Sequence, residues 1–196
     1  MDNMIVNHDQ NRNRSVNEAG ITLMEDLRML WEQHVVWTRL AIISLVFGLP
    51  DGNLVLDRLL QNPMDFEMAL IPLYGRDIAA EFSDLLTNHL VIASELVKAA
   101  KAGDSNSVRN FEQQWYTNAD EIAKFLAVVN PYWDEATWRE MLYQHLSLTE
   151  QEAVNMLQGN YRRSIQLFDE IEKQALEMAD FMATGIILQF PKAFTR

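Results

Sequence analysis

Three histidines and one glutamate occupy positions in this chain from which they could together bind a metal ion or a small ligand. His34, His89 and His145 each lie in the middle of an apolar stripe with the i, i+3, i+4, i+7 spacing of an amphipathic helix. Glu172 occupies the matching position on a later helix. Imidazole and carboxylate are ligands that zinc, iron and manganese accept. We therefore predict a central metal or small-ligand site formed by His34, His89, His145 and Glu172.

Other polar residues are predicted to support this site. We expect them to orient the histidine rings, as outer ligands do around a metal ion. These candidates are Gln33, Thr38, Gln144, Thr149, Tyr161 and Asp169. Asn118 is the comparable inward polar residue on the predicted helix 105–129, which supplies neither a histidine nor a glutamate to the predicted site.

The same four residues have a second interpretation, in which no ligand is bound. A buried histidine commonly hydrogen-bonds a neighbouring polar group, and a set of them can fix the register of packed helices. The Glu-x-x-His signature of di-iron bundles is absent, because Trp31, Leu86 and Leu142 stand three residues before the histidines. The alternative is thus a non-catalytic structural or interaction protein with a buried polar network.

Known catalytic motifs give no further guide to the reaction. The chain has no Gly-rich phosphate loop, no Ser-His-Asp arrangement and no GxSxG elbow. Neither catalytic residues nor a cofactor-binding loop are assigned from the sequence. A metal ion with an open coordination position would allow redox or hydrolytic chemistry, so whether the chain is an enzyme depends on that site.

The residues around two of the histidines form a weak internal repeat. LRMLWEQHVVWT around His34 and WREMLYQHLSLT around His145 match in an arginine, a glutamine, the histidine and a threonine at one offset. Two helices with the same arrangement around a histidine suggest a pseudo-symmetric pair that faces one centre.

Glycines and prolines divide the chain into the helices that must position these groups. Each predicted helix is long and amphipathic, and no window alternates with the period of a strand. The predicted helices cover residues 22–48, 76–102, 105–129, 134–158 and 161–189, with one or two short helices within 53–74. We predict an all-α, antiparallel up-down bundle of four to five long helices with a crossover segment, in which one long connection permits a parallel pair.

The predicted domain organisation is simple. Residues 1–20 are polar and rich in Asn, which predicts a disordered arm, and residues 21–190 form a single domain. Thr22 and Glu25 fit a capping box at the start of the first helix. A second capping-box pattern at 149–152 leaves open a break in the fourth long helix near Ser147.

Composition excludes several classes of protein. The 196 residues contain 16 Lys and Arg against 28 Asp and Glu, a net charge of −12, which argues against nucleic acid and anionic membranes as partners. No cysteine is present, so disulfides and thiolate metal sites are excluded. The longest apolar run, 40–49, is about half the length of a membrane-spanning helix. With no secretory signal, we expect a cytoplasmic protein, and the Met-rich helices are compatible with a homodimer.

Several segments resemble a family of short, uncharacterised bacterial helical-bundle proteins. The segments that carry the resemblance are LWEQHVVWTR (30–39), LLQNPMDF (59–66), PLYG (72–75), HLVIASELVKAAKAGD (89–104), WYTNADEIAKFL (115–126), NPYW (130–133) and MLYQHLSLT (141–149). Members are sometimes labelled acetylglutamate kinase or glycosyltransferase. Amino-acid kinases are α/β proteins with Gly-rich nucleotide loops, and this chain has neither feature. The resemblance implies a helical fold and carries no residue roles.

Overall fold

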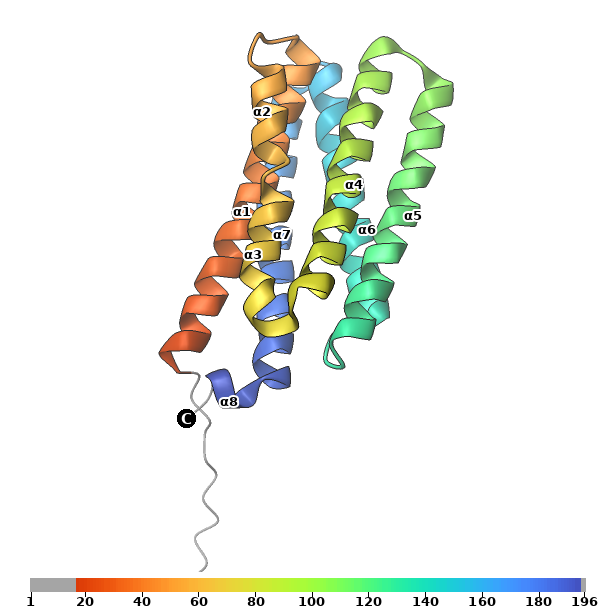
Figure 1. Cartoon of the computed structure of the whole chain (residues 1–196). Coiled ribbons are helices and arrows are strands. Elements are labelled where there is room, and N and C mark those ends of the chain that lie inside the picture. The colour runs from red at the N-terminus through yellow and green to blue at the C-terminus, as the bar shows by residue number, and fades with distance from the viewer. Residues whose placement is uncertain (1–16, 195–196) are drawn as a thin grey trace, which may run out of the picture.

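The chain is all-α, as predicted. A computed structural model describes residues 17–194, and every regular element within that range is a helix (Figure 1). The helices are α1 (Glu18–Phe47), α2 (Gly52–Leu59), α3 (Asn62–Tyr74), α4 (Arg76–Ala102), α5 (Ser105–Val129), α6 (Glu135–Leu157), α7 (Tyr161–Gln189) and α8 (Pro191–Phe194). None of them is long and apolar enough to cross a membrane.

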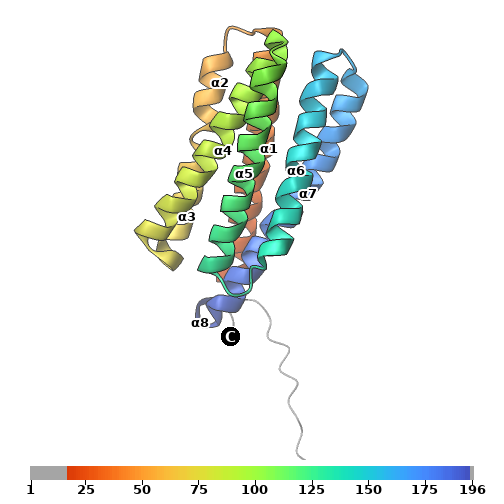
Figure 2. The same cartoon turned by 90° about the vertical axis from the view of Figure 1, so that its right-hand side faces the viewer.

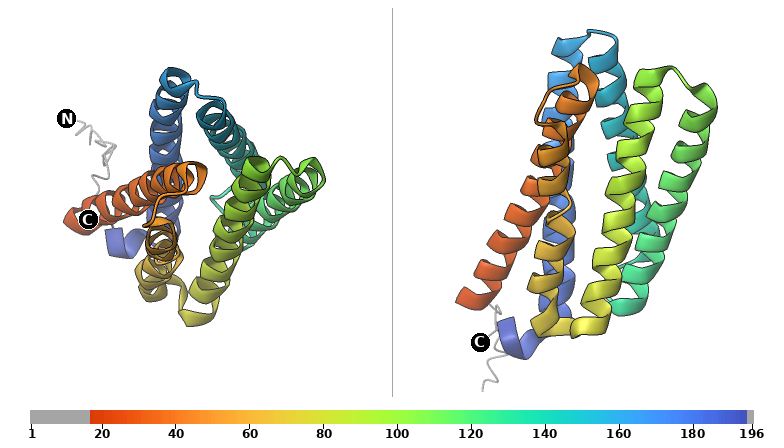
Figure 3. Two further views of the ribbon diagram at one scale, coloured as in Figure 1. Left: turned by 90° about the horizontal axis from the view of Figure 1, so that it is seen from above. Right: turned by 45° about the horizontal axis from the view of Figure 1, so that its top comes forward.

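The helices form three antiparallel hairpins that close into a ring. The first hairpin pairs α1 with α2 and α3, the second pairs α4 with α5, and the third pairs α6 with α7. Neighbouring hairpins meet where α3 packs on α4, α5 on α6, and α7 on α1. Helices α1, α4 and α6 run in the same direction and also contact one another, so they form the inner layer of the ring (Figures 1 and 3).

The predicted crossover segment forms one arm of a hairpin and does not only connect two helices. Helices α2 and α3 together run antiparallel to α1 and take the place of one long return helix (Figure 2). Because this segment returns the chain to the starting end, α4 lies parallel to α1, which agrees with the predicted parallel pair.

Side-chain caps explain where α5 and α6 begin. The Asp104 carboxylate accepts from the backbone N–H groups of Asn106 and Ser107 at the start of α5, and the Asp134 carboxylate accepts from that of Thr137 at the start of α6. Both helices begin as predicted. Helix α6 is continuous from Glu135 to Leu157, so the capping-box pattern inside it marks no break.

The first helix begins earlier than predicted. The Asn17 side chain accepts from the Gly20 backbone N–H and caps α1, which therefore starts at Glu18 and not at residue 22. Residues 18–20, predicted as part of a disordered arm, belong to this helix, and residues 1–16 of that prediction lie outside the described range.

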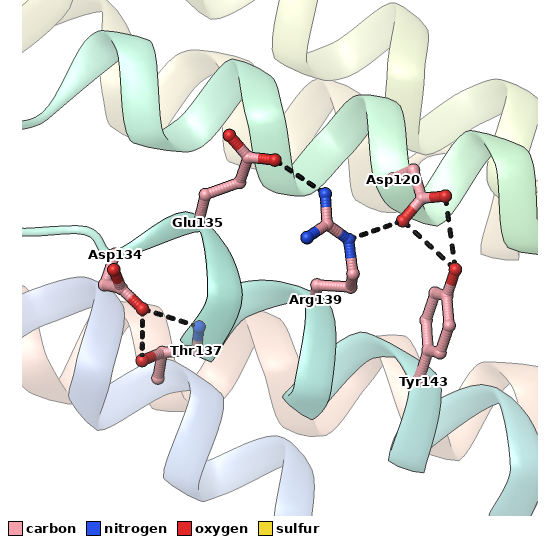
Figure 4. A network of polar contacts seen from close by, with 6 residues as sticks. All are labelled: Asp120, Asp134, Glu135, Thr137, Arg139 and Tyr143. Atoms are coloured by element: carbon pink, nitrogen blue, oxygen red, sulfur yellow. Dashed lines mark hydrogen bonds and ion pairs between the residues drawn. The ribbon is translucent and has the colours of Figure 1, made fainter.

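Ion pairs and hydrogen bonds connect neighbouring hairpins. Arg139 on α6 donates to Asp120 on α5 at 2.8 Å and to Glu135 at 2.6 Å, and the Tyr143 hydroxyl donates to the same aspartate at 3.1 Å (Figure 4). Arg28 on α1 likewise binds Asp180 on α7 at 2.6 Å. The two arginines that match in the sequence repeat thus both join neighbouring hairpins.

Candidate functional site

The three predicted histidines come together on the inner helices. His34 on α1, His89 on α4 and His145 on α6 are only 2–3% exposed. The ring centroids of His34 and His145 lie 5.8 Å apart. The three rings are close enough for their charges to interact, since His34 helps to lower the pKa of both other histidines. We call this group the three-histidine centre.

Each histidine is held by a side-chain amide from the second arm of its own hairpin. The Nδ1-to-oxygen distances are 3.0 Å for His34 and Asn62, 2.8 Å for His89 and Asn118, and 3.1 Å for His145 and Gln174. An amide oxygen can only accept, so Nδ1 carries the proton and Nε2 is the acceptor nitrogen of each ring.

The side-chain nitrogen of each amide also makes a hydrogen bond. It donates to a backbone carbonyl that lies four residues before the histidine which the same amide binds. The acceptors are Leu30 for Asn62 at 3.0 Å, Leu85 for Asn118 at 3.1 Å, and Met141 for Gln174 at 2.9 Å. Each amide therefore binds both the ring and the backbone of the opposite helix, which fixes the register of the hairpin.

These pairs reveal a threefold repeat. The histidines follow one another at intervals of 55 and 56 residues, and Asn62, Asn118 and Gln174 at intervals of 56. Each amide stands 28 or 29 residues after its histidine. Sequence reasoning recognised the repeat only around His34 and His145 and missed Asn62 and Gln174. The constant interval was the signal that could have found them.

Glu172 is not part of the three-histidine centre. It is half-buried on α7, and its carboxyl lies against that of Glu32 on α1. Burial, together with this neighbouring carboxyl, raises the pKa of Glu32. Gln174, two residues further along, takes the inward position, because two residues correspond to about 200° around a helix. The inward face of α7 thus differs from the one predicted.

The residues predicted to orient the rings have other roles. Thr38 donates to the backbone carbonyl of His34 at 2.7 Å, and Gln33 accepts from Arg58 at 3.4 Å. Gln144, Tyr161 and Asp169 are exposed. The hairpin amides perform the predicted orienting role.

The geometry gives the predicted metal centre no support. Within residues 17–194, no group of three or more His, Asp or Glu side chains is arranged to hold a metal ion. The predicted carboxylate ligand, Glu172, lies elsewhere, and the amides engage Nδ1 of each histidine, so Nε2 is the only ring nitrogen left to bind a ligand. The centre itself is a buried network of three histidine–amide pairs, with amides in the place predicted for the glutamate.

Burial keeps the three-histidine centre uncharged. It lowers the pKa of His34 to about 4 and those of His89 and His145 to about 3. The unfolded chain therefore binds these protons more tightly than the folded chain does. The stability that the neutral rings provide is present above pH 6.5 and is lost as the pH falls from there toward 4.

A buried ion pair close to the centre responds to pH in the opposite sense. Glu152 on α6 is 1% exposed and is bound by Arg39 on α1. Burial raises the pKa of Glu152 to about 7, although the arginine acts to lower it. The folded chain binds this proton more tightly, so the stability from the neutral carboxyl is lost as the pH rises from about 4.5 to 7.

A cavity lies one helical turn beyond the histidines. Each inner helix lines it with the residue four positions after its histidine: Thr38, Ala93 and Thr149. The remaining wall is mainly apolar and includes Ile42, Leu45, Leu59, Leu90, Val97 and Val154. Its volume is about 70 Å³, counted as the space open to the centre of a water molecule. One water needs about 10–15 Å³ on this measure. We call it the apolar cavity.

Two buried polar atoms in the wall of the apolar cavity have no hydrogen-bond partner. They are Nε1 of Trp115 and the hydroxyl oxygen of Thr149, on residues that are 3% and 4% exposed. The ring of Trp115 lies 5.3 Å from that of His89, so this side chain connects the cavity to the three-histidine centre. The threonine equivalent to Thr149 on α1, Thr38, has its hydroxyl satisfied by a backbone carbonyl. An unpaired buried polar group costs about 1–3 kcal/mol, which a suitable ligand would recover.

Comparison with known proteins identifies no relative whose function could be compared with this site. No family model, no curated protein and no solved structure matches the chain. The resemblance to bacterial helical-bundle proteins stays a prediction.

Proposed function

We propose that the protein is a non-catalytic binding protein that holds a small, mainly apolar molecule in the apolar cavity. The observation that carries this proposal is the pair of unpaired polar atoms, Trp115 Nε1 and Thr149 Oγ1, in an otherwise apolar wall. The indole N–H needs an acceptor, and the hydroxyl can donate or accept. A ligand oxygen near both atoms would satisfy them.

The size of the apolar cavity limits the ligand. An engineered apolar cavity of ~150 Å³ binds benzene. The apolar cavity of this protein, at about 70 Å³, has roughly half that volume. The buried part of the ligand therefore contains roughly three or four carbon atoms and one oxygen, and any remainder extends through the mouth of the cavity.

Binding fits the three-histidine centre better than acid–base catalysis does. A general base works best when its pKa is near the operating pH. The three rings have pKa values of about 3 to 4, so they accept protons poorly at neutral pH. We assign them a structural role, in which the amide pairs hold the inner helices in register beneath the cavity.

Further properties complete the proposal. The charge of −12 supports a protein that does not bind nucleic acid, and a cytoplasmic location and a homodimeric state remain as predicted from the sequence. The metal centre of His34, His89, His145 and Glu172 is a separate hypothesis that addition of zinc, iron and manganese tests.

Saturation-transfer difference NMR with 1-butanol as the probe tests the proposed function. The native chain should transfer saturation to the alcohol. Ala93→Leu, which fills the cavity, should abolish the transfer, whereas Ala80→Leu should keep it, because this alanine is also half-buried on α4 but does not line the cavity.

Two outcomes would overturn the proposal. One is no transfer from the native chain at any alcohol concentration up to tens of millimolar. The other is equal transfer from the native chain and from a folded Ala93→Leu variant. If that variant does not fold, Thr149→Leu gives the same comparison.

A further inference from the structure

The apolar cavity has one charged residue in its wall. Glu150 on α6 is half-buried beside Val154, the most exposed of the lining residues, so the two mark the mouth. Glu112 on α5 is half-buried as well, and its charge helps to raise the pKa of Glu150. Burial raises the pKa of the Tyr116 hydroxyl, and the negative charges of Glu150 and Glu112 raise it further. On α5, Glu112 lies on the same helical face as Val108 and Trp115, which both line the cavity, so each of two neighbouring hairpins places an acidic group near the mouth.

Neither acidic group is neutralised by the protein. Among residues 17–194, no Lys or Arg forms an ion pair with Glu112 or Glu150. The basic residues near this end of the bundle have other partners: Lys98 binds Glu95, Lys101 donates to the Leu45 carbonyl, and Arg109 donates to the Asn106 side chain. Two like charges in a partly desolvated position favour a bound cation.

The charged and neutral groups of the site are arranged in two levels. On α5, Glu112 stands one turn before Trp115, and on α6 Glu150 directly follows Thr149. The acidic pair is half-buried at the mouth, whereas the unpaired indole N–H and hydroxyl are almost fully buried. The three residues from Glu112 to Trp115 rise about 4.5 Å along α5, a distance that an extended chain of three or four carbon atoms spans.

We propose that the ligand is a short aliphatic amino alcohol, with its ammonium group between Glu112 and Glu150 and its hydroxyl at Trp115 and Thr149. This inference rests on the proposed function, because it assigns a ligand class to the same cavity. The hydroxyl accepts from the indole N–H and donates to the threonine oxygen, and the carbon chain fills the apolar part. A simple alkylammonium would leave the indole unsatisfied, and a carboxylic acid would be repelled at the mouth.

Three probes of similar length test separately whether the cavity binds a ligand and whether it prefers an amino alcohol. They are 4-amino-1-butanol, 1-butanol and 4-hydroxybutyrate, compared by titration followed by NMR at pH 7 and low salt. At this pH an alkyl amine is charged, since the comparable side chain of Lys has a pKa of about 10.4. We expect the amino alcohol to bind about fivefold more tightly than 1-butanol, a ratio typical of one partly exposed ion pair. The carboxylate should bind most weakly.

A matched pair of variants locates the charge. Glu150→Gln should remove the preference for the amine, whereas Glu140→Gln should keep it, because Glu140 is exposed on the same helix and does not line the cavity. Raising the salt concentration to 1 M should reduce the preference in the native chain, because salt screens exposed charges.

The outcomes distinguish the two proposals. Equal affinity for 4-amino-1-butanol and 1-butanol, tighter binding of 4-hydroxybutyrate, or an unchanged amine preference in Glu150→Gln would overturn the amino alcohol and leave the cavity as a binding site. Failure of all three probes to bind the native chain would overturn the proposed function itself.

Discussion

The pair of His89 and Asn118 gives the sharpest test of the three-histidine centre. Replacing His89 by Leu removes the ring N–H and leaves the Asn118 oxygen without its donor in a site only 3–4% exposed. A buried polar group left without a partner costs about 1–3 kcal/mol. We therefore expect His89→Leu to lower the free energy of unfolding by that amount, although leucine suits an apolar core.

Replacing the partner residue, Asn118, by Leu should lower the free energy of unfolding by a similar amount, because it also leaves a buried polar group unpaired. Asn118→Leu leaves the Nδ1–H of His89 unpaired and also removes the 3.1 Å bond to the Leu85 carbonyl. That carbonyl lies within α4, so the helix ladder still engages it. We expect a loss of about 1–3 kcal/mol for this variant as well.

The double variant distinguishes a coupled pair from two independent residues. With both polar groups gone, neither is left unpaired, and the double variant should be about 1–3 kcal/mol more stable than the sum of the single effects predicts. Urea unfolding followed by circular dichroism measures all four free energies, and the slope with urea should stay constant across the cycle. Additivity within about 0.5 kcal/mol would refute the reasoning. The equivalent cycle at His34 and Asn62 should give a similar coupling.

Four further expectations follow from single features of the structure. The free energy of unfolding should fall by about 2 kcal/mol per pH unit on average as the pH is lowered from 6.5 to 5, because three histidines gain protons on unfolding and one buried glutamate partly offsets them. A flat profile in urea unfolding would contradict the buried neutral rings. Gly185→Ala should cost about 1–3 kcal/mol in the same assay, because a Cβ there would overlap the buried indole of Trp133, whereas a Cβ at Gly52 would make only ordinary van der Waals contacts with Ser44, so Gly52→Ala should be close to neutral. Thr149→Val should raise the stability of the free protein by about 1 kcal/mol by removing an unpaired hydroxyl, and Thr38→Val, which loses a hydrogen bond, should not; equal effects would be evidence against the orphaned hydroxyl. Stoichiometric zinc, iron or manganese should leave the midpoint of thermal unfolding unchanged, and a rise with any of them would restore the predicted metal centre.

The boundaries of the helices were predictable because local signals determine them. Residues 76–102, 105–129 and 161–189 are helical as predicted, and the caps and glycines that end them act over one turn of chain. The start of α1 was missed because Thr22 and Glu25 present a capping box that competes with the Asn17 cap used in the structure. Capping-box patterns are short and also occur inside helices, as the one at 149–152 does within the continuous α6.

The candidate site was only partly predictable. The inward positions of His34, His89 and His145 follow from the apolar stripes of single helices. The stripe of α7 is broad enough that Glu172 and Gln174 both lie near it, and packing against α1 and α6 places Gln174 inside. Asn62 was missed because it belongs to a broken return arm, for which local patterns give no facing direction.

The all-α class, the long helices and the burial of the three histidines could be predicted from the chain alone, because helical periodicity and capping depend on residues within a few turns of one another. The folded structure was needed to show which amide binds each ring, that three hairpins form a ring around the histidines, and that two polar atoms remain unpaired in a cavity. Those features depend on contacts between residues at least 28 positions apart, and such contacts are set by how whole helices pack.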